Sequence, residues 1–144
     1  MARKLQKFIL FSVGADTYAM PLLADSHFMV CDKTSAIPGV DSKVRGLTYH
    51  NGNIITILDT AKILKIKRNS AHNDCLLFNF EDDLYGLLVD EGGETVRVQR
   101  SFSDGQKKVF KKYVKINKHT STPLSAGKVY VLEPEELLGS ANIL

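Results

Sequence analysis

The stretch VRGLTYHNGNIITILD, residues 44–59, predicts most about the fold of this chain. It contains two β-rich runs on either side of Asn51-Gly52, the pair best able to supply the positive φ angles of a type I′ hairpin turn. A two-residue loop then pairs Tyr49 with Ile54 and Thr48 with Ile55. The second run is apolar on both faces, whereas a half-solvated strand is polar on one. Its outer face is therefore either covered by the rest of the chain or kept for a partner.

Outward from this hairpin, the chain alternates short β-rich runs with turn signals, a pattern typical of an all-β protein. We expect further strands at 7–13, 17–20, 27–31, 75–80, 84–89, 95–98, 113–116 and 128–132. Only short helices are expected, among them 61–65 and the segment after Pro134. Strands this short favour closure into small barrels, and both halves of the chain show a similar order of elements. We therefore expect one domain over residues 1–144 with two sub-barrels and a boundary near 66–73.

The composition is that of a soluble globular protein: 144 residues, 44% of them hydrophobic and 24% charged. No run approaches the roughly 20 apolar residues of a membrane helix, so we expect no membrane insertion and a cytoplasmic location. Cys31 and Cys75 lie far apart without a CxxC pattern, and two buried, reduced thiols are favoured over a disulfide or a metal site.

The order of these motifs resembles the CheW-like domain of bacterial chemotaxis coupling proteins. The resemblance rests on VRGLTYHNGNIITILD (44–59), YGLLVD (85–90) and GKVYVL (127–132) before EELL (135–138), and it covers roughly residues 6–138. It implies two five-stranded SH3-like barrels packed side by side. It also implies a non-enzymatic adaptor, monomeric when alone, that joins the cytoplasmic tip of a methyl-accepting chemoreceptor to the regulatory domain of a CheA-type histidine kinase.

Members of that family bind the receptor helix in an apolar groove between the barrels. The resemblance places this groove along apolar strand residues and puts three polar residues at its rim. The apolar residues are Val30, Ile55, Ile57, Leu87 and Val89, and the rim residues are Asp25, His27 and Asn51. The rim departs from the family pattern, because Asn51 stands where the turn usually carries Arg and His27 where an acidic residue is usual. Asp25 stands at a position that is usually apolar.

Little in the sequence favours catalysis or a bound cofactor. The four histidines are scattered without metal-ligand spacing, and the run His72-Asn73-Asp74-Cys75 has no matching second half. Gly92-Gly93 is flanked by acids, which repel phosphate. We therefore expect no enzyme, no metal and no cofactor.

A basic segment near the C-terminus is the main alternative site. It carries Arg97, Arg100, Lys107, Lys108, Lys111, Lys112, Lys115 and Lys118 against one acid, with Phe102, Phe110 and Tyr113 between them. Basic residues that track phosphates beside aromatics that stack on bases are typical of single-strand binding. The alternative function is thus a small nucleic-acid-binding barrel. The favoured interpretation is that the aromatics anchor a long loop whose charges are solvated. Docking of an acidic protein partner is the second interpretation, and nucleic-acid binding is the third.

Overall fold

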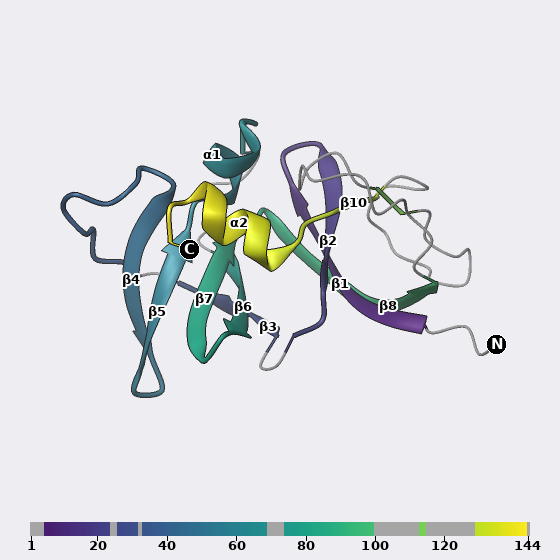
Figure 1. The fold of residues 1–144 in the computed structure, drawn as a ribbon, viewed down its shortest axis with the longest axis horizontal. Helices are drawn as coiled ribbons and strands as arrows, with labels where there is room; N and C mark the ends of the chain where they lie inside the picture. The colour runs from purple at the N-terminus through teal and green to yellow at the C-terminus, as the bar shows by residue number, and fades with distance from the viewer. Residues whose placement is uncertain are drawn as a thin grey trace.

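The structure is a computed structural model that describes residues 5–23, 26–31, 33–68, 74–99, 113–114 and 129–143 (Figure 1). Its elements, in chain order, are β1 (Leu5–Val13), β2 (Asp16–Pro21), β3 (His27–Val30), β4 (Val44–His50), β5 (Asn53–Leu58), α1 (Thr60–Leu64), β6 (Asp74–Phe80), β7 (Asp83–Leu88), β8 (Glu91–Gln99), β9 (Tyr113–Val114), β10 (Val129–Val131) and α2 (Pro134–Ser140). Within the described residues no helix has the length and apolar character needed to cross a membrane.

The strands form two five-stranded sheets, in the orders β8-β1-β2-β10-β9 and β3-β6-β7-β5-β4. We call them the first and the second barrel. They lie side by side in Figure 1, the first on the right and the second on the left, and α2 runs from β10 across the strands of the second barrel. This confirms the prediction of an all-β chain made of two SH3-like barrels with few short helices.

The central hairpin has the predicted register. Tyr49 pairs with Ile54 and Thr48 with Ile55, and the turn residues Asn51 and Gly52 have φ angles of 51° and 80°. Positive φ at both central positions is the signature of the type I′ turn, whose twist matches that of the two strands. A bulge between Val44 and Gly46 bends β4 at its other end.

The predicted boundary at 66–73 is wrong, because the two barrels are not successive in the chain. The chain enters the second barrel after β2 and leaves it between β7 and β8, so the N-terminal hairpin β1–β2 pairs with C-terminal strands. The segment 66–73 lies instead between two strands of the same barrel. β7 belongs there because it pairs in parallel with β5, with Ile55 opposite Leu84 and Leu58 opposite Leu87.

Three clusters of buried apolar side chains make up the core. One fills the first barrel (Phe8, Leu10, Ala19, Val96, Val129, Val131) and another fills the second (Cys31, Ile55, Ile57, Cys75, Leu77, Leu88). The third and largest joins the two barrels and both helices; it includes Ile9, Phe11, Met20, Leu58, Ala61, Leu76, Phe78, Leu87, Val89, Leu132 and Leu137. A strand such as β5 is apolar on both faces because one face fills its own barrel and the other packs in the inter-barrel core.

The two cysteines were expected to be reduced, and the structure contradicts this. Cys31 and Cys75 form a disulfide, and both are buried. The antiparallel pairing of β3 with β6 brings their Cα atoms to 6.5 Å, within the range that a disulfide spans. Spacing along the chain gave no sign of this long-range pairing.

Candidate functional site

The structure separates the predicted groove residues into two groups. Val30 is 57% exposed, whereas Ile55, Ile57, Leu87 and Val89 are each 0% exposed. The prediction that these four side chains line an open groove is wrong, because they belong to the interior of the second barrel or to the inter-barrel core. The apolar side chains that do not fill the interior of a barrel thus pack between the two barrels and hold them together.

Two of the three predicted rim residues lie at the surface of the second barrel. His27 begins β3, and Asn51 is at the tip of the β4–β5 hairpin; both side chains are exposed. The third, Asp25, lies outside the described residues. Of the two exposed polar residues, His27 lies on the same strand as Val30 and Asn51 lies in the β4–β5 turn.

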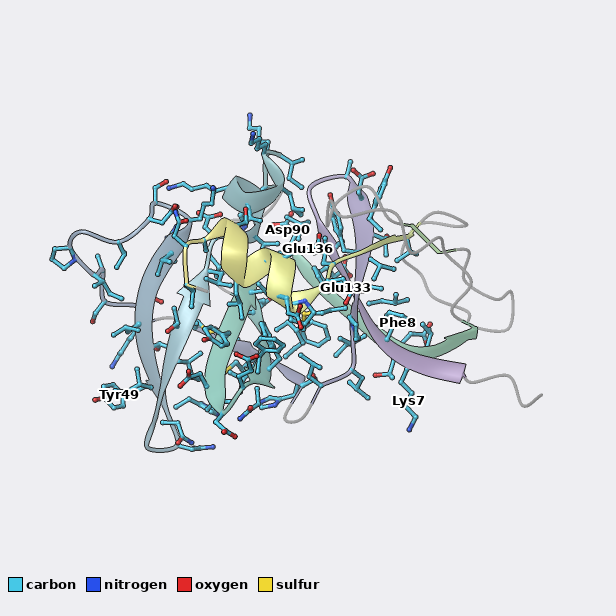
Figure 2. The ribbon with its side chains drawn as sticks, in the orientation of Figure 1. Lys7, Phe8, Tyr49, Asp90, Glu133 and Glu136 are labelled. Carbon is cyan, nitrogen blue, oxygen red and sulfur yellow. A yellow bond between two sulfur atoms is a disulfide. The ribbon has the colours of Figure 1, made fainter. Side chains whose placement is uncertain are left out.

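Three exposed apolar side chains lie on the surface of the second barrel: Val30 on β3, Tyr49 on β4 and Ile54 on β5. We call them the β3–β5 patch. Tyr49 and Ile54 are cross-strand partners and are 74% and 52% exposed. Figure 2 shows Tyr49 standing away from the strands into solvent, at the lower left of the molecule. Large apolar side chains grouped on a surface are typical of protein contacts, and tyrosine is enriched there.

A shallow hollow connects Val30 with Tyr49. Its volume is about 250 Å³, and it is lined by Met29, Val30, Lys33, Thr48, Tyr49 and His50. It lies along the seam where the edge strands β3 and β4 approach each other as the barrel closes. The seam is held at one end, where the Thr48 hydroxyl donates a 2.6 Å hydrogen bond to the carbonyl of Lys33. The hollow is large enough for one protruding side chain of a partner.

Two imidazoles lie at the other end of the seam. The ring centroids of His27 and His50 are 6.4 Å apart, and the rings are tilted by 47°. Nε2 of His50 is 3.3 Å from the amide nitrogen of Asn51. The patch is consequently bordered by polar groups on the side of these two imidazoles.

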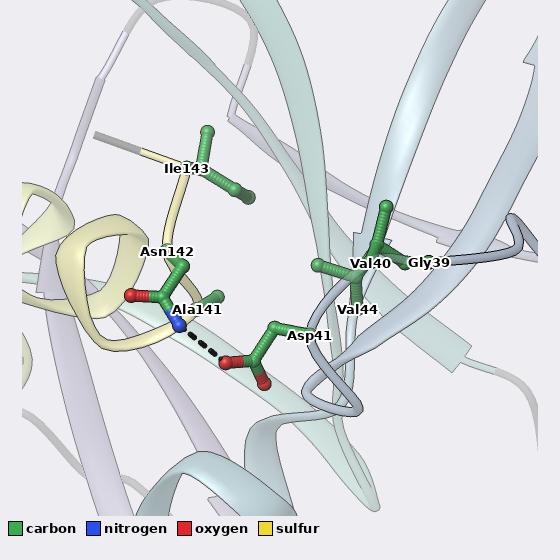
Figure 3. Close-up of a pocket in the computed structure, with 7 residues that line it drawn as sticks. All are labelled: Gly39, Val40, Asp41, Val44, Ala141, Asn142 and Ile143. Atoms are coloured by element: carbon green, nitrogen blue, oxygen red, sulfur yellow. Dashed lines mark hydrogen bonds between the residues drawn. The ribbon is translucent and has the colours of Figure 1, made fainter.

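A second hollow, of about 510 Å³, lies between the loop before β4 and the C-terminal tail (Figure 3). Its lining includes Val40, Val44 and Ile143, and its polar wall is the pair Asp41–Asn142, in which the Asn142 amide donates a 2.6 Å hydrogen bond to the carboxylate.

The same carboxylate accepts a hydrogen bond from the backbone N–H of Lys43, and this bond is the main reason that the pKa of Asp41 is lowered. The ammonium of Lys43 in turn donates to the carbonyl of Ser140 at the end of α2. The hydrogen bonds from Asn142 to Asp41 and from Lys43 to Ser140 thus fasten the C-terminal tail to the loop, which indicates a structural role.

No cluster of three or more histidine, cysteine or carboxylate side chains suited to a metal occurs in the described residues. Of the basic segment, Arg97 lies on β8, opposite Lys7 of β1, while Arg100, Lys107, Lys108, Lys111 and Lys112 lie outside the described residues. The nucleic-acid alternative therefore stays a prediction from sequence.

Sequence reasoning missed Tyr49 and Ile54 as site residues, although the hairpin register already paired them on one face. What it lacked was the knowledge of which face the first barrel covers. That covering ends before the hairpin tip, so the same face is buried at Leu58 and exposed at Ile54.

Comparison with known proteins finds a matching family model and similar solved structures. A family model described as the CheW-like domain matches residues 7–140. Among solved structures, the crystal structure of the scaffolding protein TtCheW from Thermoanaerobacter tengcongensis is similar, with a TM-score of 0.69 over 90% of this chain and 89% of that chain. The two sequences are 15% identical, so this likeness concerns the fold. No curated protein sequence matches the chain significantly.

Proposed function

The chain belongs to the CheW-like domain family, and we propose on this basis that it is a non-enzymatic scaffold of bacterial chemotaxis or a related motility pathway. In this role it couples the cytoplasmic tip of a chemoreceptor to the regulatory domain of a CheA-type histidine kinase, and it works in the cytoplasm. The observation that carries the proposal is the family match over residues 7–140, which spans both barrels. A protein of this kind acts through surfaces and not through a catalytic centre.

We assign the β3–β5 patch to the contact with the receptor helix. The buried apolar side chains of the strands pack in the inter-barrel core and are not accessible to a partner. The contact with the receptor helix is therefore made by exposed side chains. Tyr49, Ile54 and Val30 are large, apolar and exposed, and the hollow between Val30 and Tyr49 accepts a side chain from a helix laid along the seam. A standard interface covers ~800 Å² on each partner, so the kinase domain binds a different face of the molecule.

The test uses the purified full-length chain with a receptor cytoplasmic fragment and the kinase regulatory domain from the same cell. We expect both to bind with dissociation constants below roughly 100 μM, an affinity that weak signalling contacts reach. The double variant Tyr49→Ser/Ile54→Ser is expected to lose receptor binding and keep kinase binding. Val40→Ser is the matched control, because Val40 is also exposed, at 43%, but lies at the other hollow.

The possible outcomes separate the two parts of the proposal. If the folded wild-type chain binds neither partner, the coupling function is refuted. If it binds both and the double variant binds the receptor as tightly as the wild type, the patch assignment alone is refuted.

A further inference from the structure

We propose that the Cys31–Cys75 disulfide is a reversible redox lock on β3, and that its reduction releases this strand while the rest of the fold stays formed. The bond joins the end of β3 to the start of β6 inside the second barrel, and the two residues are 44 positions apart in the chain. The lock goes beyond the proposed function, on which it rests for the cytoplasmic location alone.

The register of the sheet places both sulfur atoms on the same face. Met29 of β3 pairs with Cys75 and Val30 pairs with Asp74, so Cys31 lies diagonally across from Cys75. Side chains alternate between the two faces of a strand, so the side chains of Met29, Cys31 and Cys75 share the face that forms the barrel interior. The sheet therefore keeps the two thiols close together after reduction, and the bond can form again without refolding.

β3 depends on this bond more than its neighbours do. It is the edge strand of the second sheet, paired with β6 from His27 to Val30, and its residues are exposed or half-buried. The strands β6 and β7, in contrast, consist mostly of buried residues. Because local stability follows the buried apolar contacts of a segment, β3 opens more easily than β6 or β7. A covalent bond at the end of β3 limits that opening.

The reaction is thiol–disulfide exchange with a dithiol. One thiolate of the dithiol attacks the sulfur of Cys31, and the sulfur of Cys75 leaves and takes up a proton. The second thiol of the reagent then displaces Cys31, which also takes up a proton, while the reagent becomes a disulfide. Cys31 is 3% exposed and Cys75 is 0% exposed, so the attack follows local opening of β3.

The compartment favours a switch over a permanent bond. The proposed function places the chain in the cytoplasm, where thiols are kept reduced and the disulfides that do form are usually transient or redox-sensing. Oxidation and reduction of this bond therefore both occur under conditions that such a chain meets.

The lock acts on the hollow of the second barrel. Met29 and Val30 line this hollow from β3, and Thr48, Tyr49 and His50 line it from β4. Release of β3 moves one wall of the hollow relative to the other. The oxidised chain therefore keeps the β3–β5 patch in the shape described above, and the reduced chain loosens it.

The first experiment equilibrates the full-length chain with mixtures of reduced and oxidised dithiothreitol. Acid then quenches the exchange, a maleimide labels the free thiols under denaturing conditions, and mass spectrometry counts the labels. We expect one reversible transition between the unlabelled and the doubly labelled chain, as for a two-electron couple. Cooperative thermal unfolding of both forms is expected, at a temperature about 5–15 °C lower for the reduced form.

The second experiment measures backbone amide hydrogen exchange of the two forms at low urea concentrations. We expect the amides of β3 to exchange at least about 10-fold faster after reduction, at a rate that urea hardly changes, because the opening is local. The amides of β1 are expected to keep the steep urea dependence of exchange through global unfolding.

The double variant Cys31→Ala/Cys75→Ala is the matched control. Its β3 amides are expected to exchange like those of the reduced wild type and not to respond to dithiothreitol. The wild-type chain in its two redox states carries the test even if this variant does not fold.

Four results would overturn the lock: no bond forms in oxidised dithiothreitol, the bond of the folded chain resists reduction, reduction unfolds the whole chain, or the β3 amides exchange equally in both forms. These readouts use neither receptor nor kinase. Failure of the lock therefore leaves the proposed function standing, and failure of partner binding leaves the lock standing.

Discussion

The backbone N–H of Gly14 donates a 2.6 Å hydrogen bond to the side-chain carboxylate of Asp90, 76 residues further along the chain. Gly14 is in the turn between β1 and β2, and Asp90 is where the chain crosses from the second barrel back to the first. The other carboxylate oxygen is 3.2 Å from Nε of Arg68, in the segment after α1. One nearly buried carboxylate thus connects three segments at the junction of the barrels.

Replacing Asp90 with Asn is expected to lower the free energy of unfolding by about 2–3 kcal/mol. The change removes the charge that Arg68 faces in a site where the Asp90 side chain is 5% exposed, and breaking such pairs is costly. Arg68 is 17% exposed, which keeps the loss below that of a fully buried pair. Urea unfolding measures it, with Asp82→Asn on an exposed turn as the control. A loss no larger than that of the control would show that the junction does not depend on this charge.

Ile54 and Ile57 offer a matched pair on one strand. Ile57 is 0% exposed in the second barrel, so Ile57→Ala is expected to cost about 2–5 kcal/mol through lost burial and a cavity. Ile54 is 52% exposed, and Ile54→Ala is expected to change stability by less than about 1 kcal/mol. Thermal or urea unfolding of both variants compares them directly. Equal losses would mean that the exposed patch is part of the core.

The contrast between exposed Ile54 and buried Ile57 shows how much of the structure could be predicted from the sequence. Local pairing was predictable: the Asn51-Gly52 turn set the register of β4–β5, and the second hairpin, expected at 75–80 and 84–89, is β6–β7 at Asp74–Phe80 and Asp83–Leu88. Apolar residues on both faces of β5 were also visible. The sequence could not show which face of β5 packs against another part of the chain. The pattern of apolar residues along a strand is the same whether the other barrel or a partner protein covers that face.

The errors concern contacts between distant parts of the chain. The parallel pairings β5–β7 and β2–β10 decide which strands share a barrel, and no turn signal connects such strands. The wrong boundary at 66–73 follows from the parallel pairing of β5 with β7. The disulfide was missed because the pairing of β3 with β6, which are also distant in the chain, was not predicted. For the site, His27, Val30 and Asn51 are exposed, and their role in binding a partner stays a prediction. Ile55, Ile57, Leu87 and Val89 were taken for surface residues because their apolar side chains were ascribed to contact with a partner, but they are buried.

Gly46 is the glycine whose replacement is expected to be most harmful. Its φ is +150°, and a Cβ there would overlap the carbonyl oxygen of Ser35, to which β4 is bridged through Leu47. Gly46→Ala is therefore expected to destabilise the chain by more than about 2 kcal/mol, through backbone strain and the displaced bridge. In contrast, Gly139 lies in α2 with open space around a Cβ, so Gly139→Ala is expected to stabilise by up to about 1 kcal/mol. Denaturant midpoints of the two variants should move in opposite directions, and a neutral Gly46→Ala would contradict the tight closure of the seam at Ser35.

Tyr18 predicts how stability changes at alkaline pH. Its phenol is buried between Phe11 and Tyr130, and burial, with a smaller contribution from Asp16, raises its pKa from 10.0 to about 12. Between these two values the unfolded chain has lost the phenolic proton and the folded chain keeps it, so stability falls as pH rises. Below pH 10 both states hold the proton, and the group adds no pH dependence.

The expected loss from Tyr18 is about 1–2 kcal/mol between pH 10 and 12, after allowance for solvent screening. Urea midpoints measured across this range should fall more steeply in the wild type than in Tyr18→Phe, which has no proton to lose. Tyr49→Phe is the control substitution, because Tyr49 is 74% exposed. A wild-type slope retained in Tyr18→Phe would show that other groups cause the alkaline loss, and Tyr85, whose pKa is also raised by burial, would be the next residue to replace.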